Sequence, residues 1–340
     1  MNLAELNKVA LAMVAPGRGI LAADESSGTI KKRFDAIGDE STEDNRRDYR
    51  EMLFRSTEGM KNISGVILYD ETIWQKAKDG TPLVEIIKQA GALPGIKVDE
   101  GTKPLHGCPG ELVTVGLDKL ADRLPKYYNQ GARFAKWRAV IDIGAGIPSW
   151  TCIHANAHAL ARYAALCQAA QIVPIVEPEV LMDGDHDIDR CVSVTEWLLK
   201  QTFQELYYNR VALEGMVLKP NMAVAGKKSA KKASVEEVAE KTVRLLKACV
   251  PGAVPGIAFL SGGQSDQDAT AHLDAMNKIG NLPWRLTFSY GRALQHAPQT
   301  TWAGKAENVA AAQRAFSHRA KMNSLATLGQ WQAGLEPKAA

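Results

Sequence analysis

Two patterns of apolar and polar positions alternate along the chain. Short apolar runs rich in β-branched residues are each followed by a longer stretch whose apolar residues recur at helical spacing. The eight runs begin roughly 30 to 45 residues apart and cover Gly19–Ala23, Ile63–Tyr69, Ala92–Val98, Phe134–Ile141, Ile172–Glu177, Gly215–Lys219, Gly256–Ser261 and Arg285–Ser289. A strand followed by a helix, eight times, predicts an α/β protein with the (β/α)8 TIM barrel fold. The rival architecture, a doubly wound sheet, usually has fewer strands and a glycine-rich first turn.

Helical stretches separate these runs and also occupy both ends of the chain. The spacing predicts helices over Ser41–Glu58, Ala155–Ala170, Val192–Asn209, Ser234–Cys249, Ala269–Lys278 and Glu307–Leu325. The first residues have the spacing of an amphipathic helix and lack the basic leader of a signal peptide. We therefore expect a single barrel domain over residues 1–340, with extra N- and C-terminal helices and a mobile C-terminal tail over residues 326–340.

Polar side chains follow the apolar runs at the points where the strands are expected to end. They are Asp24, Asp70, Lys97, Glu177, Glu179, Lys219, Ser261 and Ser289. In a (β/α)8 barrel the carboxyl ends of the strands face the active site. Strands also end on polar residues simply because they reach the surface, but carboxylates and lysines after this many strands favour a catalytic site.

Lys219 closes an apolar strand in the segment Gly215–Met222. A lysine at the boundary of a dry interior is desolvated, which disfavours its charged ammonium form. A neutral amine can attack a carbonyl carbon and form a Schiff base. A lysine at a strand end can equally extend its ammonium group to solvent, and this segment alone leaves both interpretations open.

Charged residues also alternate with apolar ones inside two consecutive strands. Lys136 and Arg138 share one strand face, and Glu177 and Glu179 share a face of the next strand. Because an unpaired buried charge is costly, the cations are expected to face the carboxylates, an arrangement that suits general acid–base chemistry beside a reactive lysine. A structural ion-pair cluster is the alternative. Pro178 has no N–H to donate, so we expect the fifth strand to end near it.

Two strands run into glycine turns that suit an anion, in the segments Phe259–Gln264 and Phe288–Arg292. Glycine lets backbone N–H groups approach an anion closely, and barrels often hold phosphate after their seventh and eighth strands. Arg292 adds a planar donor fork for phosphate oxygens. The turn after the first strand adds the hydroxyls of Ser26, Ser27 and Thr29, which either cap a helix or hold a second phosphate. The alternative is that the glycines merely make tight turns.

Three further motifs give weaker signals. His154 and His158 have helical spacing but no glutamate for a zinc hydrolase, so we expect an ordinary helix face. The segment Asp183–Asp189 lacks the glycine and the glutamate of a calcium loop and is interpreted as a solvated acidic turn. The basic segment Gly226–Lys232 has no interleaved aromatic residues, and we expect a mobile solvated loop.

Composition and charge exclude several classes of protein. The chain has 340 residues, 46% of them apolar and 23% charged, which excludes a wholly disordered chain and a small disulfide scaffold. Its net charge of +3 is too balanced for nucleic acid or an anionic membrane as the main partner. Five cysteines without a close pair indicate free thiols, mostly in the core, in a reducing compartment. The longest uncharged stretch, Ile143–Ala161, contains a proline and two histidines and is not expected to span a membrane.

Taken together, these segments resemble class I fructose-bisphosphate aldolases. The matching stretches run in the family's order along nearly the whole chain and are Gly19–Ser26, Gly95–Asp99, Phe134–Arg138, Pro174–Glu179, Leu218–Met222, Phe259–Ser265 and Ser289–Leu294. The resemblance implies an aldehyde-lyase that cleaves fructose 1,6-bisphosphate reversibly to dihydroxyacetone phosphate and glyceraldehyde 3-phosphate, in glycolysis or gluconeogenesis. It also implies Schiff-base chemistry with no cofactor and no metal.

The resemblance further implies a role for each matching residue. Lys219 would form the Schiff base with the C2 ketone, Glu177 would be the general acid–base, and Asp24 would orient the C4 hydroxyl. Lys136 and Glu179 would assist proton transfer and keep the lysine reactive. The residues expected to bind substrate are Ser261, Gly262, Gly263, Ser289, Gly291 and Arg292 at the C1 phosphate, Ser26, Thr29, Lys97 and Arg138 near the C6 phosphate, and Arg33.

The chain departs from the family's pattern at its C-terminus. Many relatives end in a tyrosine whose tail assists proton exchange at C3, whereas the last tyrosine of this chain is Tyr290.

The resemblance also implies a cytoplasmic homo-oligomer, a tetramer, whose partner is a small sugar phosphate and neither nucleic acid nor a membrane. The near alternative is a related Schiff-base aldolase that prefers another sugar bisphosphate, such as sedoheptulose 1,7-bisphosphate. The remote alternative is a non-catalytic scaffold protein.

Overall fold

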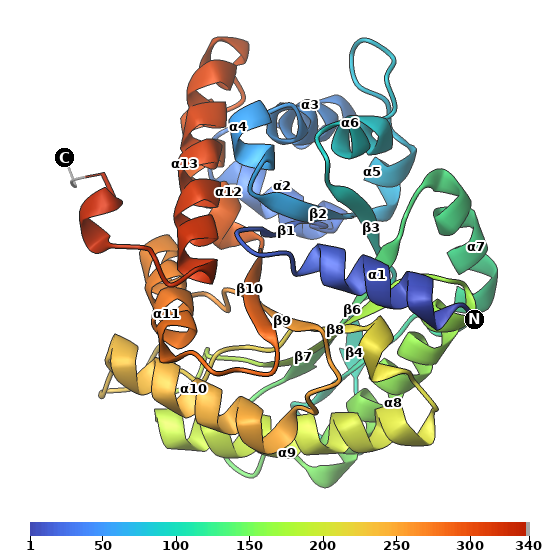
Figure 1. Cartoon of the computed structure of the whole chain (residues 1–340), viewed down its shortest axis with the longest axis vertical. Helices are drawn as coiled ribbons and strands as arrows, with labels where there is room; N and C mark the ends of the chain where they lie inside the picture. Colours follow the sequence, from blue (N-terminus) through green and yellow to red (C-terminus); the bar gives the residue numbers. More distant parts are fainter. Residues whose placement is uncertain (338–340) are drawn as a thin grey trace.

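Eight parallel strands close into a barrel in the computed structural model, which describes residues 1–337 (Figure 1). Around the barrel the strands follow the order β1, β2, β3, β6, β7, β8, β9 and β10. Their bounds are β1 Gly19–Ala23, β2 Ile63–Leu68, β3 Leu93–Lys97, β6 Phe134–Ile141, β7 Val173–Val180, β8 Val217–Leu218, β9 Gly256–Phe259 and β10 Arg285–Tyr290. Each of the eight predicted runs contributes one strand, so the predicted (β/α)8 barrel is confirmed.

The helices surround the barrel, and a small antiparallel hairpin follows β3. The helices of residues 1–337 are α1 Leu3–Met13, α2 Ser27–Asp35, α3 Glu43–Phe54, α4 Thr57–Met60, α5 Asp70–Trp74, α6 Leu83–Gln89, α7 Leu120–Gln130, α8 Trp150–Ala169, α9 Ile188–Tyr208, α10 Val235–Cys249, α11 Asp266–Ile279, α12 Arg292–Trp302 and α13 Val309–Thr327. The hairpin pairs β4 Thr102–Pro104 with β5 Leu112–Thr114. Side-chain caps begin five of the longer helices, at Thr42, Ser149, Asp187, Ser234 and Ser265.

The amino-terminal half of the barrel interior is apolar. Inward-facing Ile20, Phe134 and Ile175 form one buried cluster with residues of α1, the helix that lies across this end of the barrel (Figure 1). Gly95 leaves room for the Phe134 ring, because a Cβ on Gly95 would lie 2.2 Å from a ring carbon. The interior is therefore filled and closed at this end, and the charged side chains of the barrel interior gather at the carboxyl ends of the strands.

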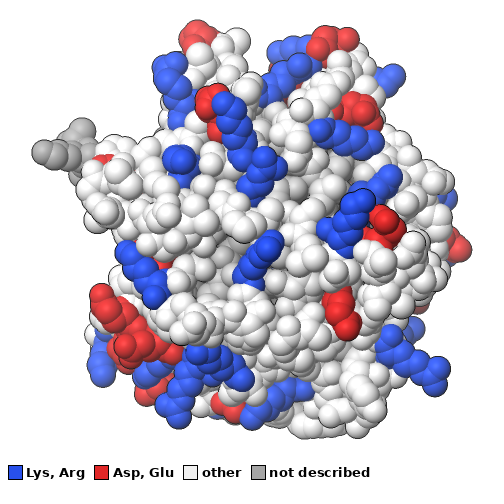
Figure 2. All heavy atoms as spheres, in the orientation of Figure 1, with Lys and Arg blue, Asp and Glu red and all other residues white. Residues whose placement is uncertain are grey.

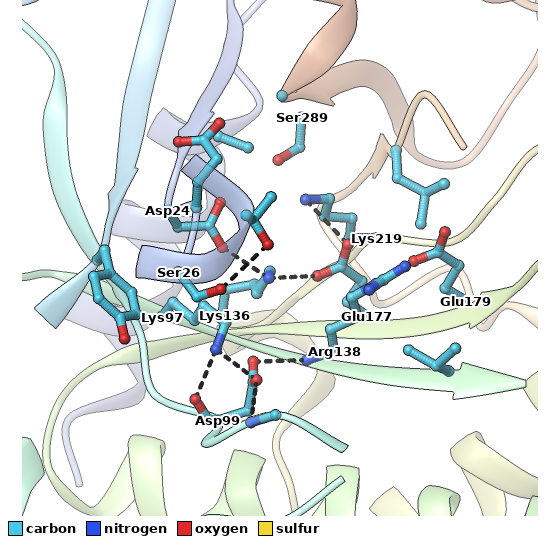
Figure 3. Close-up of a pocket in the computed structure, with 18 of the residues that line it drawn as sticks. Asp24, Ser26, Lys97, Asp99, Lys136, Arg138, Glu177, Glu179, Lys219 and Ser289 are labelled. Carbon is cyan, nitrogen blue, oxygen red and sulfur yellow. Dashed lines mark hydrogen bonds and ion pairs between the residues drawn. The ribbon is translucent and has the colours of Figure 1, made fainter. Parts of the chain in front are cut away.

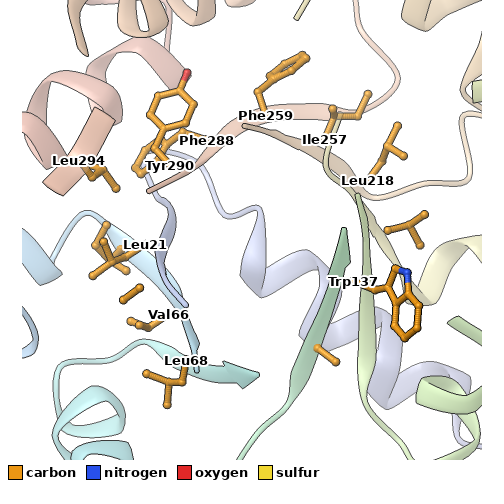
Figure 4. Packing of buried hydrophobic residues seen from close by; sticks show 14 of the residues in the cluster. Leu21, Val66, Leu68, Trp137, Leu218, Ile257, Phe259, Phe288, Tyr290 and Leu294 are labelled. Atoms are coloured by element: carbon orange, nitrogen blue, oxygen red, sulfur yellow. The ribbon is translucent and has the colours of Figure 1, made fainter. Parts of the chain in front are cut away.

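The alternate strand residues point outward and pack beneath the helices (Figure 4). Leu21, Leu218 and Phe288 belong to this outer cluster and are fully buried. Trp137 also belongs to it and stacks on Tyr163 of α8, with ring centroids 5.6 Å apart. Because side chains alternate along a strand, an outward Trp137 places its two neighbours in the chain inside the barrel.

The fifth barrel strand is longer than predicted, because Pro178 does not end it. β7 continues to Val180, with Pro178 opposite Ala139 of β6. The backbone N–H of Lys219, just after β8, donates a 2.8 Å hydrogen bond to the carbonyl of Val176. Backbone groups of residues two apart in a strand face the same side, so the position where Pro178 lacks an N–H also faces β8. β8 has already ended at Leu218, and the proline therefore removes no bond from the sheet.

The segment after α13 folds back onto the preceding helices as far as the structure describes it. The Glu336 carboxylate lies 2.5 Å from Arg319 and 3.1 Å from His318, both on α13. The backbone N–H of Trp331 donates to Asp274 of α11 at 2.9 Å. The mobility expected for residues 326–340 stays a prediction, and its last three residues, 338–340, lie outside the described residues.

Candidate active site

A cavity of about 920 Å³ lies at the carboxyl ends of the barrel strands. Its lining includes all sixteen residues that the sequence predicts for the site, namely Asp24, Ser26, Thr29, Arg33, Lys97, Lys136, Arg138, Glu177, Glu179, Lys219, Ser261, Gly262, Gly263, Ser289, Gly291 and Arg292. Figure 3 shows the central part of this cavity. Because charged and hydroxyl side chains dominate the lining, the cavity suits a small, highly charged ligand rather than an apolar one.

Four charged side chains from four elements form a connected row at the bottom of the cavity (Figure 3). Lys219 Nζ lies 3.1 Å from Glu177 Oε1, and Lys136 Nζ lies 3.2 Å from the other oxygen of that carboxylate, Oε2. Lys136 Nζ also lies 2.8 Å from Asp24 Oδ2. The row alternates anion and cation, so each charge that is taken out of water faces an opposite one.

The strand pattern explains why these four groups meet. Glu177 is an inward residue of β7, Lys136 is an inward residue of β6, and Lys219 directly follows β8. Asp24 directly follows β1, across the barrel from β7. Side chains at the carboxyl ends of barrel strands converge on the axis, which brings together residues far apart in the sequence.

The electrostatics fix the charge of two members of the row. Burial raises the pKa of the Asp24 carboxyl, but Lys136 and then Lys219 outweigh burial and lower this pKa to about 2. Burial also disfavours the ammonium form of Lys136, yet Asp24 and Glu177 hold its pKa well above the usual value. Asp24 and Lys136 therefore stay charged at neutral pH and form a fixed ion pair beside Glu177.

A second set of ion pairs borders the row on the β3 and β7 side. Arg138 donates from Nε to Glu179, and Lys97 Nζ lies 2.7 Å from the Asp99 carboxylate (Figure 3). Asp99 also accepts a 3.4 Å bond from the backbone N–H of Arg138. The sequence patterns indicate no role for Asp99, although it lies just beyond the end of β3, much as Asp24 lies just beyond the end of β1.

The opposite side of the cavity is built from the turns after β9 and β10. Gly262 and Gly263 have φ values of +55° and +84°, a backbone conformation that other residues rarely adopt. The Ser289 hydroxyl is buried and has no hydrogen-bond partner within residues 1–337. Arg292, at the start of α12, directs Nη2 to the carbonyl of Gln264 at a long 3.4 Å. This side therefore offers a guanidinium and a free hydroxyl next to a glycine turn, which suits an anionic group.

The turn after β1 holds an arginine in place. Arg33 Nη1 lies 2.5 Å from the buried Glu25 carboxylate, a partner that sequence reasoning missed. The hydroxyls of Ser26 and Thr29 lie 3.2 Å apart. Ser26 precedes α2, but its side chain makes no capping hydrogen bond. The structure therefore does not support Ser26 as a helix cap, and its role in phosphate binding stays a prediction.

Two of the weak motifs prove to be part of the cavity. The segment Gly226–Lys232, expected as a mobile solvated loop, places Lys227 in the lining, and the acidic turn contributes Asp183. Their side chains form a 2.5 Å ion pair. In contrast, His154 and His158 both face Glu205 away from this cavity, and no group of histidine, cysteine and acidic side chains in residues 1–337 is arranged to hold a metal ion.

The cysteines lie mostly in the core, as the sequence predicts. All five cysteines are free, and Cys152, Cys167 and Cys191 are buried. On the face of the molecule seen in Figure 2, acidic and basic side chains both lie around the rim, and separate basic side chains lie nearer the centre among uncharged residues. Among residues 1–337, no helix combines the length and apolar character needed to cross a membrane.

A buried lysine beside a carboxylate at the carboxyl end of a parallel barrel, flanked by two groups of basic and hydroxyl side chains, is typical of a barrel enzyme that acts on phosphorylated carbonyl compounds. Comparison with known proteins specifies the family. The model of the glycolytic class I fructose-bisphosphate aldolase family matches residues 5–340.

Individual relatives are similar along nearly their whole length. "Probable fructose-bisphosphate aldolase class 1" of Xanthomonas campestris is 58% identical over 333 residues, covering 98% of this chain and 100% of the relative. The cytosolic fructose-bisphosphate aldolase 6 of Arabidopsis thaliana is 56% identical, covering 93% of this chain and 88% of the relative. A crystal structure of Plasmodium falciparum fructose-bisphosphate aldolase, in complex with TRAP and a small-molecule inhibitor, superimposes with a TM-score of 0.97 at 49% identity, covering 98% of this chain and 96% of that one.

The chain therefore belongs to the class I fructose-bisphosphate aldolase family. Its activity is that of a metal-independent lyase, the reversible cleavage of fructose 1,6-bisphosphate to dihydroxyacetone phosphate and glyceraldehyde 3-phosphate. The prediction made from the sequence motifs is confirmed for the family and for the reaction.

Proposed function

We propose that Lys219 attacks the C2 carbonyl of fructose 1,6-bisphosphate and forms a Schiff base with it. The observation that carries this proposal is the 3.1 Å contact between Lys219 Nζ and Glu177 Oε1, two residues that are each only 3% exposed. A carboxylate at this distance can take one proton from the Lys219 ammonium, which frees the amine to attack C2. A second proton passes from the attached nitrogen to the C2 oxygen and gives the carbinolamine, and Glu177 then returns its own proton to the carbinolamine hydroxyl. That hydroxyl then leaves as water, and a protonated imine remains at C2.

The imine makes cleavage of the C3–C4 bond favourable. Glu177 removes the proton of the C4 hydroxyl, the C3–C4 electron pair moves toward the imine, and the C4 oxygen becomes the aldehyde oxygen of glyceraldehyde 3-phosphate. The other half remains on Lys219 as an enamine. Protonation at C3 and hydrolysis of the imine release dihydroxyacetone phosphate and restore the lysine. Because the protonated imine accepts the electron pair, this step needs no Lewis acid.

The neighbouring charges would position the acid–base. Lys136 lies between the Asp24 and Glu177 carboxylates, at 2.8 and 3.2 Å, and so holds the Glu177 side chain toward the lysine. Asp24, charged at neutral pH, would accept a hydrogen bond from the C4 hydroxyl and orient it for deprotonation. Glu179 would act through its ion pair with Arg138, which lies beside the same row.

The two phosphates of the substrate would bind on opposite sides of the row. The C1 phosphate would lie against Ser261, Gly262, Gly263, Ser289, Gly291 and Arg292, which surround the turns after β9 and β10. The C6 phosphate would lie near Ser26, Thr29, Lys97 and Arg138, with Arg33 as a further contact. Lys97 and Arg138 already have carboxylate partners, so the substrate must compete for them. We expect the C6 side to bind phosphate less tightly than the C1 side.

We further propose that the whole chain is one barrel domain and that four copies assemble in the cytoplasm. The location is supported by two Arabidopsis relatives, 56% and 55% identical, that are named cytosolic. The tetramer rests on the expectation for the family. Light scattering of the purified protein should give about four times the chain mass of 36.9 kDa, and a mass of one chain at working concentration would refute the assembly.

A substitution series with kinetic assays tests the proposed chemistry. Lys219→Met should lower kcat by about 10⁴-fold or more, because no other group can form the imine. Lys126→Met removes an exposed lysine of α7 outside the cavity and should leave kcat unchanged. Fructose 1,6-bisphosphate should be cleaved with a higher kcat/KM than sedoheptulose 1,7-bisphosphate. Full activity of the Lys219 variant, or the reverse substrate preference, would overturn the corresponding part of the proposal.

A further inference from the structure

Lys227 lies at the edge of the cavity, directly over the glycine turn that follows β9. A Cβ placed on Gly263 would be 2.8 Å from Lys227 Nζ and 3.4 Å from Arg292 Nη2. An ammonium and a guanidinium thus both lie close to one point, beside a turn whose two glycines have left-handed backbone conformations. Neither the strand pattern nor the matching family motifs include Lys227.

The backbone around Lys227 is held firmly, unlike that of a solvated loop. Lys227 N–H donates to the Met182 carbonyl at 2.6 Å, and the flanking N–H groups of residues 226 and 228 donate to the 186 and 184 carbonyls at 2.8 and 3.0 Å. A Cβ on Gly226 would lie 2.2 Å from the Gly184 carbonyl oxygen, so this close approach needs a glycine. Lys232 Nζ adds bonds of 2.9 and 2.8 Å to the carbonyls of Gly226 and Lys227.

The present partner of Lys227 is a weak one. Its ammonium lies 2.5 Å from Asp183 Oδ1, but 45% of the Lys227 side chain and 59% of the Asp183 side chain are exposed. Exposed pairs of this kind contribute little, because water screens both charges. A phosphate dianion carries more charge and more acceptor oxygens than a carboxylate, and an exposed Asp183 loses little when it returns to water.

We infer that Lys227 is a second cation of the C1-phosphate site. When a ketose 1-phosphate binds, the Lys227 ammonium leaves the Asp183 carboxylate and, together with Arg292, binds the phosphate. This inference rests on the proposed binding of the C1 phosphate at the β9 and β10 turns. It assigns Lys227 to substrate binding and to specificity for ketoses phosphorylated at C1. Asp183 competes for the same ammonium group and so tunes the affinity of the site.

Kinetics with two substrates test this inference. In Lys227→Met, KM should rise about 5- to 10-fold both for fructose 1,6-bisphosphate and for fructose 1-phosphate, with kcat within about twofold of the wild type. Lys227→Arg keeps the positive charge and should restore most of the affinity. Lys228→Met is the matched control, because Lys228 is exposed, adjacent in sequence and absent from the cavity lining, and its KM values should not change. Added salt should narrow the difference between wild type and Lys227→Met.

Borohydride trapping distinguishes a role of Lys227 in phosphate binding from a structural role of its loop. The concentration of dihydroxyacetone phosphate that gives half-maximal borohydride trapping should be higher for Lys227→Met than for the wild type. The corresponding concentration of unphosphorylated dihydroxyacetone should be the same for both enzymes. Equal losses with both ketones would overturn the inference, as would Lys227→Met and Lys228→Met variants with the same KM. If the wild-type enzyme itself cleaves neither fructose phosphate, the proposed function fails instead, and the two failures are distinguishable.

Discussion

Replacing Lys136 with methionine probes the charge row most severely, because it removes the cation that lies between two buried carboxylates. Lys136 is 5% exposed, and its Nζ lies 2.8 Å from Asp24 and 3.2 Å from Glu177. Methionine keeps most of the side-chain volume, so the change is mainly electrostatic. Breaking a buried pair by removing one partner costs about 3 to 5 kcal/mol of unfolding free energy. Because Lys219 remains beside Glu177, we expect a loss near the lower end, about 3 kcal/mol at neutral pH.

The pH dependence of this loss has a definite sign. In the wild type, Lys136 and Lys219 lower the pKa of Asp24 to about 2 against the effect of burial. Without Lys136, burial is opposed less and the folded-state pKa of Asp24 rises. A raised carboxyl pKa destabilises the folded protein at neutral pH, and protonation relieves the cost as the pH falls. The difference in stability between wild type and Lys136→Met should therefore shrink from neutral toward acid pH.

Urea unfolding at a series of pH values measures both quantities, and a double-mutant cycle with Asp24→Asn isolates the pair. The cycle should give a coupling of at least about 1 kcal/mol, because the two groups are in direct contact. Activity should fall by about 100-fold or more, since Glu177 loses the group that positions it. A stability loss below about 1 kcal/mol that does not vary with pH would refute the reasoning.

Three other predictions concern packing, titration and thiol reactivity. Gly95→Ala should lower the unfolding free energy by about 1 to 3 kcal/mol, because its Cβ would lie 2.2 Å from the Phe134 ring. Gly28→Ala is the control: a Cβ on Gly28 meets open space, and thermal unfolding should show a slightly higher unfolding free energy for this variant. The difference in unfolding free energy between wild type and Asp24→Asn should be constant near neutral pH and should shrink as the pH falls from about 4 toward 2, the range between the usual pKa of Asp24 and its folded value of about 2. Cys152, whose burial raises its pKa to about 12, should resist alkylation at neutral pH until the protein unfolds, and rapid labelling of the folded protein would contradict its placement.

The barrel could be predicted from sequence because its signals are local. Apolar runs, helical spacing and polar strand ends each involve a few neighbouring residues, and the closed order of strands follows from their number and direction. The exception, Pro178, shows where local reasoning ends. A proline is compatible with a strand when the neighbouring strand has already ended, and the length of β8 is not written in the residues around Pro178.

The inner residues of the site could be predicted for the same reason, and its outer partners could not. Strand alternation placed Lys136 and Glu177 on inward faces, and the structure brings them into contact. Glu25, Asp99 and Lys227 lie on loops, where no periodicity indicates which way a side chain points. Lys227 reaches the cavity only because residues 226–228 bond to the turn at 182–186, a long-range contact that no local pattern encodes.

Trapping of the covalent intermediate tests the central claim most directly. The folded enzyme is mixed with dihydroxyacetone phosphate and a chelator, reduced with borohydride, digested and mapped by mass spectrometry. The account predicts one reduced ketose-phosphate adduct, on Lys219, and no adduct in Lys219→Met. An adduct on a different lysine, or none in an enzyme that still cleaves fructose 1,6-bisphosphate, would contradict it.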